Sequence, residues 1–182
     1  MGASLALGIP LDKIAGALRT AKSVKGRVEV VPTPGKDYTV IIDYSHTPDS
    51  LENILRAVRG FCRGRILAVF GCGGDRDPFK RPVMGKIASE LADVSIVTSD
   101  NPRTEDPYKI LRQILAGMQE TEKPYEVIES RVSAIGRAME LAQKDDVIVL
   151  CGKGHETYQE IGHEKHHLDE REVVAAYLEG KK

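Results

Sequence analysis

The stretch Ile66–Phe70, with sequence ILAVF, runs directly into the polar loop GCGGDRD at residues 71–77, and this pairing decides the fold. Two more apolar runs lead into polar loops in the same way, DNPR at residues 100–103 and GKGHE at residues 152–156. Apolar runs that alternate with helical patterns predict parallel strands, whose carboxyl ends meet at one edge of a sheet. Open α/β sheets bind ligands at that edge. We therefore expect the three loops to lie together and form a ligand site.

The rest of the chain alternates between strand and helix patterns. Strands are expected at Val28–Val31, Tyr38–Ile42, Ile66–Phe70, Val94–Thr98, Tyr125–Ile128 and Val147–Leu150. Helices are expected from Pro48 through Val58, at Pro82–Leu91, from Pro107 through Met118, from Ser130 through Ala142, and at Arg171–Leu178. Repeated strand–helix units predict an α/β fold of three layers, a Rossmann-like, mostly parallel sheet with helices on both faces.

The first residues follow a different pattern. Leu11, Ile14 and Leu18 recur at helical spacing, and no strand precedes them to complete a strand–helix unit. The polar segment Lys22–Gly26 follows and is typical of a linker. We therefore interpret residues 1–26 as the helical end of a preceding domain plus a linker, and residues 27–182 as a domain of their own.

Composition narrows the class of protein. The 182 residues include 26 basic and 27 acidic side chains, and this balance argues against nucleic acid or an anionic membrane as partner. No apolar run reaches the ~20 residues that span a bilayer, and the start has neither a charged leader nor a cleavage pattern. Three cysteines without a CxxC pair predict free thiols. A cytoplasmic protein is expected.

The loop at residues 71–77 resembles a dinucleotide-binding fingerprint but departs from it. Arg76 stands where the GxGxxG pattern requires its third glycine, which argues against a nucleotide-dependent oxidoreductase. Glycines allow close approach of the backbone to a ligand, and Arg76 offers a fork for a carboxylate or phosphate. A tight turn with solvated charges remains the alternative.

The other two loops carry complementary groups. Arg103 can form paired hydrogen bonds with a carboxylate, Asn101 can donate and accept, and Glu156 can bind an ammonium group. Taken singly, a helix-capping turn and a glycine-rich turn explain these loops as well. Together they suit a small zwitterion with carboxylate and ammonium groups.

Two further motifs contain groups that could bind a metal or a nucleotide. His163–His167 matches the zinc-protease pattern HExxH, but the flanks, Tyr158–Ile161 and His166–Asp169, predict the arms of a short hairpin rather than a helix. We therefore expect no metal site there. Asp43 and His46 follow a strand at the same sheet edge, where they can contact a nucleotide or simply cap the strand end.

Four stretches, DYSHTPD at residues 43–49 and the three loops above, resemble in order those of the C-terminal domain of the Mur ligase family. The resemblance extends over Arg27–Leu178. Within the family, the chain is similar more specifically to members that add meso-diaminopimelate to UDP-MurNAc-L-Ala-D-Glu in peptidoglycan precursor synthesis. It implies an ATP- and Mg²⁺-dependent, amide-forming ligase that works through an acyl phosphate. It also implies a monomer.

Residue by residue, the resemblance implies two sets of contacts. Those with meso-diaminopimelate are implied for Arg76, Asp100, Asn101, Pro102, Arg103, Gly152 and Glu156. Those with ATP are implied for Arg27, Asp43 and His46. Neither a catalytic residue nor a metal ligand is implied in this stretch, because the phosphate-binding loop and the magnesium ligands belong to the family's central domain.

The chain contains no GxxxxGK[ST] motif. We therefore interpret it as part of a larger ligase that is inactive alone, in which this domain positions the amine donor. A stand-alone diamino-acid-binding module of Rossmann-like fold is the alternative. Selectivity over lysine has a physical reason, since lysine lacks the distal carboxylate and would leave a desolvated arginine without a partner.

Overall fold

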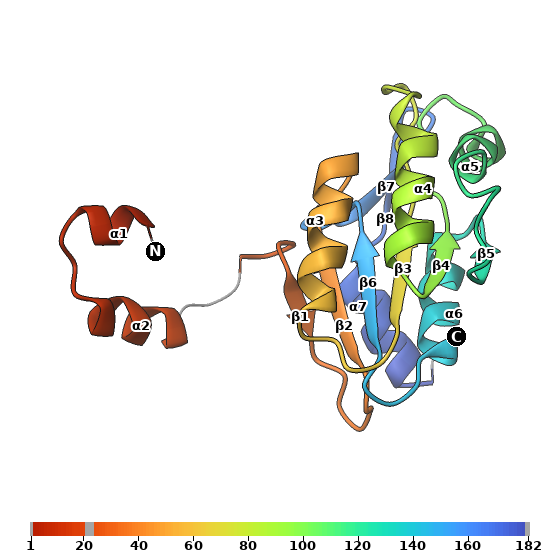
Figure 1. Ribbon diagram of the computed structural model, residues 1–182. Coiled ribbons are helices and arrows are strands. Elements are labelled where there is room, and N and C mark those ends of the chain that lie inside the picture. The colour runs from red at the N-terminus through yellow and green to blue at the C-terminus, as the bar shows by residue number, and fades with distance from the viewer. Residues whose placement is uncertain (1, 21–23, 181–182) are drawn as a thin grey trace.

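A computed structural model describes residues 2–20 and 24–180 of the chain. Its main body is a six-stranded sheet in the order β1-β2-β6-β3-β4-β5 (Figure 1). The strands are β1 (Glu29–Val31), β2 (Thr39–Asp43), β3 (Ile66–Phe70), β4 (Val94–Val97), β5 (Tyr125–Val127) and β6 (Val147–Cys151). Each predicted strand is present to within a residue or two, because each coincides with a short apolar run.

All neighbouring strands are parallel except the β1–β2 pair. The last strand of the sheet along the chain, β6, lies between β2 and β3, where Val149 pairs with Ile41 on one side and Ala68 on the other. The predicted α/β class and three-layer, mostly parallel architecture are confirmed. The proline-rich segment between β1 and β2 connects antiparallel strands.

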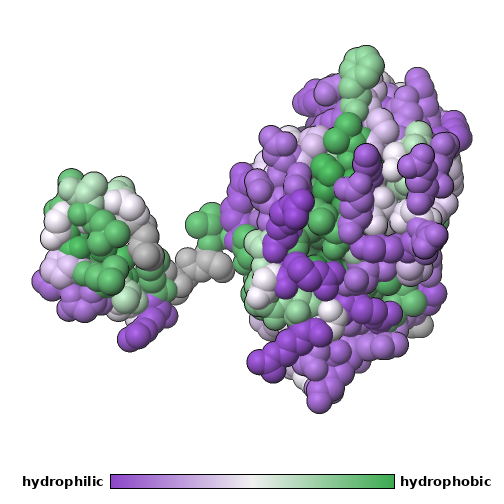
Figure 2. Space-filling view, in the orientation of Figure 1, coloured by the Kyte–Doolittle hydropathy of each residue, from purple (hydrophilic) through white to green (hydrophobic). Residues whose placement is uncertain are grey.

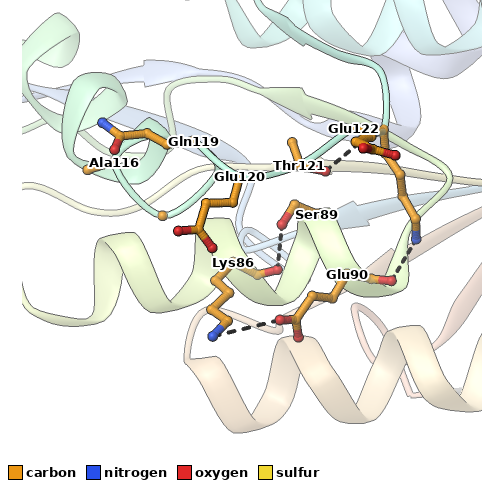
Figure 3. A pocket seen from close by; sticks show the side chains of 10 residues that line it. Lys86, Ser89, Glu90, Ala116, Gln119, Glu120, Thr121 and Glu122 are labelled. Atoms are coloured by element: carbon orange, nitrogen blue, oxygen red, sulfur yellow. Dashed lines mark hydrogen bonds and ion pairs between the residues drawn. The ribbon is translucent and has the colours of Figure 1, made fainter.

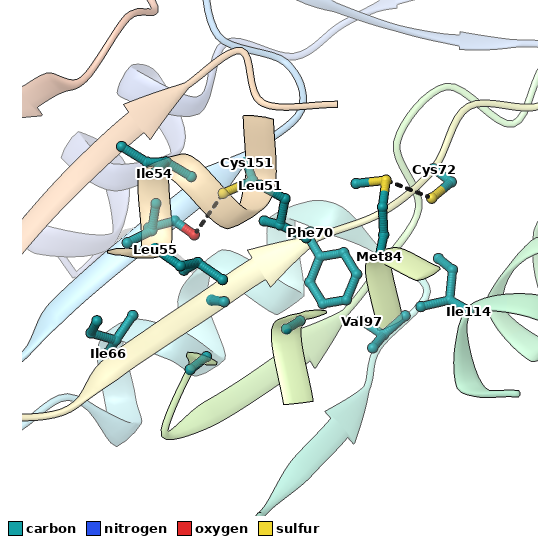
Figure 4. Close-up of a cluster of buried hydrophobic side chains, with 14 of the residues drawn as sticks. Leu51, Ile54, Leu55, Ile66, Phe70, Cys72, Met84, Val97, Ile114 and Cys151 are labelled. Carbon is teal, nitrogen blue, oxygen red and sulfur yellow. Dashed lines mark hydrogen bonds between the residues drawn. The ribbon is translucent and has the colours of Figure 1, made fainter. Parts of the chain in front are cut away.

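Helices cover both faces of the sheet (Figure 1). On one face lie α3 (Pro48–Arg59), α4 (Lys80–Leu91) and α5 (Pro107–Leu115), and on the other lie α6 (Arg131–Leu141) and α7 (Glu170–Leu178). Side chains alternate between the two faces along each strand, so Phe70 and Val149 belong to one apolar cluster and Val69 and Leu150 to the other. Figure 4 shows the first cluster, with Phe70 between Leu51 and Met84.

The helix starts follow from capping residues. Thr47 caps α3 by accepting a hydrogen bond from the Ser50 N–H, and the Ser50 hydroxyl accepts one from the Thr47 N–H. Pro48 and Pro107 occupy the first helical positions of α3 and α5, as predicted. Prediction of the α5 end was wrong, because the helix stops at Leu115 and the buried Met118 lies beyond it.

The N-terminal helices α1 (Gly2–Ala6) and α2 (Leu11–Thr20) lie apart from the sheet (Figure 1). The sequence predicted α2 but not the five-residue α1. Apolar side chains of residues 2–20, such as Leu7, Leu11 and Leu18, are exposed, and Figure 2 shows hydrophobic residues gathered on this segment. Residues 22 and 23 of the predicted linker lie outside the described residues, and the domain division at residue 26 stays a prediction.

A separate hairpin of β7 (Tyr158–Ile161) and β8 (Glu164–His167) follows β6. The predicted hairpin is confirmed, although its second arm starts at Glu164 rather than His166. His163 lies in the turn and His167 at the end of a strand, so the HExxH letters form no helix. Their resemblance to a zinc-protease motif is therefore confined to the sequence.

Candidate functional site

The candidate site lies at the carboxyl edge of the sheet, where four polar loops follow four neighbouring strands. Along the chain the loops follow β2, β3, β4 and β6, but in the sheet these strands stand in the order β2-β6-β3-β4. The strands are parallel, so all four loops leave from the same edge. The loop at residues 152–156 thereby comes to lie between residues 43–47 and the two arginine-bearing loops.

The loops at residues 100–103 and 152–156 are joined through a buried lysine. The Asn101 side-chain N–H donates to Glu156 Oε2 at 3.0 Å. The Lys153 ammonium, which is 0% exposed, donates to Asn101 Oδ1 at 2.9 Å and lies 3.3 Å from Glu156 Oε2 and 3.4 Å from Asp100 Oδ1. A buried ammonium with these partners fixes both carboxylates and the amide relative to one another.

Gly152 is required where the same two loops meet. Its φ is +119°, and a Cβ atom there would lie 2.7 Å from Asp100 Oδ2. Both the backbone conformation and the space therefore favour glycine. The structure thus brings together Asp100, Asn101, Gly152 and Glu156, as the sequence predicted.

The loop at residues 71–77 packs directly on residues 101–103. The Gly74 N–H donates to the Asn101 carbonyl at 2.9 Å, and the Arg103 Nη1 donates to the Gly74 carbonyl at 2.8 Å. A Cβ atom at Gly74 would lie only 1.9 Å from the Pro102 carbonyl oxygen. Close contact of the two backbones is possible only because position 74 is glycine.

Both candidate arginines lie near Gly73. A Cβ atom at Gly73 would be 2.9 Å from Arg103 Nη1 and 3.7 Å from Arg76 Cγ. Arg103 is largely buried, whereas Arg76 is exposed and donates from Nη1 to the carbonyl of Asp75 at 2.9 Å. The guanidinium of Arg103 is therefore held in place, while that of Arg76 extends from the rim of the site.

An ion pair between the buried Arg81 and the partly exposed Glu105 supports the loop at residues 71–77. The Arg81 guanidinium forms two hydrogen bonds with the Glu105 carboxylate, at 2.9 and 2.8 Å, and a third with the Gly73 carbonyl at 3.0 Å. Glu105 in turn accepts from the Asp75 N–H at 2.7 Å. The hydrogen bonds from Arg81 lower the pKa of Glu105 to about 2. This pair fixes the loop that carries Arg76.

Around Tyr44 the residues proposed for ATP form a second group. The Arg27 guanidinium lies 5.0 Å from the Tyr44 ring centre, and the rings of His46 and His155 lie 4.7 and 5.0 Å from it. Burial raises the pKa of Tyr44, so its hydroxyl stays protonated at neutral pH. We name Arg27, Tyr44, His46 and His155 the Tyr44 cluster.

Asp43 differs from the rest of that prediction. Its buried carboxylate accepts a hydrogen bond from the Val28 N–H at 2.8 Å and another from the Ser45 hydroxyl. These contacts are the local capping that the sequence allowed as an alternative. A contact between Asp43 and ATP stays a prediction.

Two supporting groups escaped the sequence analysis. Lys153 lies in the GKGHE loop, whose glycines and Glu156 were the predicted functional groups. The apolar strand directly before this loop is the feature of the sequence that could have indicated a buried lysine. Glu160, which accepts from Arg103 Nε at 2.9 Å, gave no signal, because this contact depends on how the β7–β8 hairpin folds back.

Several large surface pockets lie elsewhere. One of about 630 Å³ is formed by the carboxyl ends of α4 and α5 and the segment that leads into β5, at the opposite edge of the sheet (Figure 3). It is lined by both basic and acidic side chains, such as Lys86, Glu90 and Glu120, and by none of the predicted site residues. The candidate site is therefore defined by convergent polar groups rather than by cavity volume.

Residues 2–20 and 24–180 contain no cluster of three or more His, Cys, Asp or Glu side chains placed to hold a metal ion. Within the same described ranges, no helix is both long and apolar enough to cross a membrane.

Comparison with known proteins identifies the domain. A sequence model of the family described as "Mur ligase, glutamate ligase domain" matches residues 26–154. The chain belongs to the Mur ligase family. The match begins at Gly26, just before the Tyr44 cluster starts at Arg27, and ends at Gly154 inside the loop of Lys153. It thus includes the strands β2, β6, β3 and β4 of the candidate site.

Curated relatives of this Mur ligase domain resemble it over nearly its whole length. UDP-N-acetylmuramoyl-L-alanyl-D-glutamate–2,6-diaminopimelate ligases of Trichormus variabilis and Clostridium botulinum are 56% and 53% identical to it over 179 and 175 residues. The alignments cover 98% and 96% of this chain. A solved structure of a ligase with that name superposes with a TM-score of 0.82 at 36% identity and covers 98% of the chain. The chain spans 36% of the length of each of these three proteins.

Proposed function

We propose that this Mur ligase domain is the amino-acid-binding part of an ATP-dependent ligase that adds meso-diaminopimelate to UDP-MurNAc-L-Ala-D-Glu. The observation that carries the proposal is the joining of Asn101, Arg103 and Glu156 at one sheet edge, where Asn101 donates directly to Glu156. The relatives at 56% and 53% identity are named as 2,6-diaminopimelate ligases, which supports the choice of substrates. A cytoplasmic, monomeric ligase of peptidoglycan precursor synthesis is proposed with it.

Each charged group at the distal end of the proposed ligand has a matching group in the site. The distal centre of meso-diaminopimelate carries a carboxylate and an ammonium, which suit the guanidinium groups of Arg103 and Arg76 and the carboxylate of Glu156 respectively. Asn101 can bind either group, while Asp100, Pro102 and Gly152 shape the backbone around them. The domain's part in the reaction is to hold the amine donor in a fixed orientation. Such orientation lowers the activation free energy by roughly several kcal/mol.

The Tyr44 cluster is the proposed contact surface for ATP. Its three rings can stack against a nucleotide base, and the Arg27 guanidinium can face phosphate oxygens, so the residues present fit a nucleotide. When bound, ATP supplies the phosphoryl group that activates the acceptor carboxylate. The phosphate-binding loop and the residues that would bind Mg²⁺ are proposed to lie outside this chain, which contains no GxxxxGK[ST] motif.

A hybrid enzyme tests the proposal. In the Trichormus variabilis ligase, the segment aligned with this chain is replaced by the chain itself, and phosphate release is measured with UDP-MurNAc-L-Ala-D-Glu, ATP and either meso-diaminopimelate or lysine. We expect turnover with meso-diaminopimelate and little with lysine. A hybrid that unfolds cooperatively and binds ATP but turns over neither amino acid would overturn the proposal.

The stand-alone module remains the second candidate, because the domain holds its polar loops in place through its own contacts. Isothermal titration of the 182-residue chain with meso-diaminopimelate separates the two. Binding by the chain together with an inactive, folded hybrid would favour the module.

Arg103→Ala in the active hybrid tests the selectivity. The variant removes the guanidinium proposed to bind the distal carboxylate, a group that lysine lacks. We therefore expect the KM for meso-diaminopimelate to rise by about 30-fold or more, which corresponds to at least about 2 kcal/mol. The KM for ATP should change by less than about twofold. Equal losses for both substrates would show that Arg103 does not recognise the distal carboxylate.

A further inference from the structure

The β7–β8 hairpin is hydrogen-bonded to the loop that carries the candidate specificity residues. The Arg103 N–H donates to the Glu160 carbonyl at 3.0 Å, and the Gly162 N–H donates to the Arg103 carbonyl at 2.8 Å. These bonds form a parallel bridge between Arg103 and Ile161. The hairpin lies beyond residue 154, where the family match ends, and so adds a contact that the matched core does not contain.

Side chains of β7 reinforce the same contact. Glu160 Oε2 accepts from Arg103 Nε at 2.9 Å, and the Glu160 N–H donates to Asn101 Oδ1 at 2.9 Å. The Gln159 side-chain N–H donates to the Asp100 carbonyl at 2.7 Å. Two consecutive residues of the hairpin thereby reach three of the four residues of the loop at 100–103.

The backbone of Arg103 needs such support. Its φ is +50°, in the left-handed region that a non-glycine residue occupies only with strain. Such a conformation persists only where the surroundings hold it. The two backbone hydrogen bonds from the hairpin hold it here.

Two nitrogen atoms of the Arg103 guanidinium donate to protein acceptors, and the third faces the open site. Nε donates to Glu160, and Nη1 donates to the Gly74 carbonyl at 2.8 Å. Within the described residues, Nη2 has no protein acceptor, and the side chain keeps 20% of its surface exposed. Contacts on two sides of the planar group fix its orientation and leave Nη2 free for a ligand carboxylate.

We propose that Glu160 is a positioning residue that orients Arg103, so that the guanidinium presents Nη2 to the distal carboxylate of the diamino acid. This inference rests on the proposed function. Glu160 touches Arg103 rather than the ligand, and its carboxylate acts before the ligand arrives by restricting the arginine to one rotamer. A preorganised arginine loses less freedom when it binds its ligand.

The test uses the active hybrid enzyme and Glu160→Ala. Loss of the Nε acceptor frees the guanidinium, so the KM for meso-diaminopimelate should rise about tenfold, while kcat and the KM for ATP stay within about twofold. Glu160→Gln keeps an acceptor for Nε, and its rise should be about threefold or less. Glu164→Ala, on the exposed strand β8, is the matched control and should leave all three constants unchanged.

A double-mutant cycle identifies the route. If Glu160 acts through Arg103, the double variant Arg103→Ala/Glu160→Ala will have the same KM for meso-diaminopimelate as Arg103→Ala alone. Multiplied effects in the double variant would overturn the inference, as would an unchanged or lower KM in Glu160→Ala. A parallel loss of kcat, ATP affinity and thermal stability would assign Glu160 a merely structural role. If Glu160→Ala fails to fold, the Glu160→Gln pair decides the cycle.

The two proposals fail in different ways. A folded wild-type hybrid without turnover contradicts the proposed function before any Glu160 variant is made. A wild-type hybrid that selects meso-diaminopimelate, combined with a Glu160→Ala variant of unchanged KM, contradicts only the positioning role.

Discussion

The ion pair at the candidate site and the ion pair that lines the pocket at the opposite edge of the sheet differ in their exposure. At the carboxyl edge Lys153 and Asp100 have side chains that are 0% and 7% exposed, whereas at the amino edge Lys86 and Glu90 are 70% and 59% exposed. Charges buried away from water interact more strongly and are costly to leave unpaired, while a solvated pair contributes little. The buried pair of Lys153 and Asp100 therefore fixes the loops at the carboxyl edge, whereas the solvated pair of Lys86 and Glu90 only lines an open pocket.

The carboxyl edge also has a support beneath it. Arg131, at the start of α6, and Glu170, at the start of α7, form an ion pair whose side chains are both 0% exposed. Arg131 Nη2 donates to Glu170 at 2.7 Å and to the Cys151 carbonyl at 2.8 Å, immediately before Gly152. Two helix starts are thus fixed to the end of β6, the strand that leads into the loop of Lys153.

Breaking that support should produce the largest effect. Arg131→Met leaves the Glu170 carboxylate buried without its partner, so the free energy of unfolding should fall by about 3–5 kcal/mol in urea denaturation. Lys86→Met at the amino edge is the control and should change it by less than about 0.5 kcal/mol. Similar losses in both variants would remove the distinction between the edges.

The double variant Arg131→Met/Glu170→Leu sharpens this result. Within the described residues, Arg131 Nη1 and Glu170 Oε2 are buried without hydrogen-bond partners, so an apolar pair removes two unsatisfied groups. We expect it to recover at least about half of the stability that Arg131→Met loses. Failure to recover would mean that the hydrogen bond to Cys151 dominates.

Disrupting a close backbone contact at the carboxyl edge should produce the next largest loss of stability. Gly74→Ala places a Cβ atom 1.9 Å from the Pro102 carbonyl oxygen, so the loops at 71–77 and 100–103 must separate. We expect a loss of about 2 kcal/mol in unfolding free energy, and weaker binding of meso-diaminopimelate by the hybrid. Gly16→Ala in α2, where nothing lies within 4 Å, should be neutral or stabilising.

Much of this geometry could be predicted from the sequence. The strands coincide with β-branched, apolar runs such as ILAVF, and the convergence of their loops follows from parallel topology alone. The glycines of residues 71–77 were expected to let the backbone approach a ligand, and the structure places Gly74 against the Pro102 carbonyl. Approach to a ligand stays a prediction. The roles assigned to Arg76, Arg103 and Glu156 in ligand binding stay predictions.

What the sequence did not reveal are contacts between residues far apart in the chain. Arg103 and Glu160 are 57 residues apart, and Arg131 and Glu170 are 39 apart. Charged side chains in a sequence are by default read as solvated, since most are. Only the packing of the hairpin and of α6 against α7 shows which of them are buried and paired.

The smallest predicted effect is a difference between the two edges in how the unfolding free energy depends on pH. Arg81 lowers the pKa of Glu105 to about 2, from 4.5 for a free glutamate, so the folded state favours the carboxylate. The resulting stability is present above pH 4.5 and is lost as the pH falls from 4.5 toward 2. Glu105→Gln should therefore lower the unfolding free energy at neutral pH by about 1 kcal/mol. The difference from wild type should shrink over that acidic range, whereas Glu90→Gln at the amino edge should follow the wild-type profile throughout. A constant difference between Glu105→Gln and wild type from neutral pH down to pH 3 would mean that Arg81 does not hold Glu105 in its charged form.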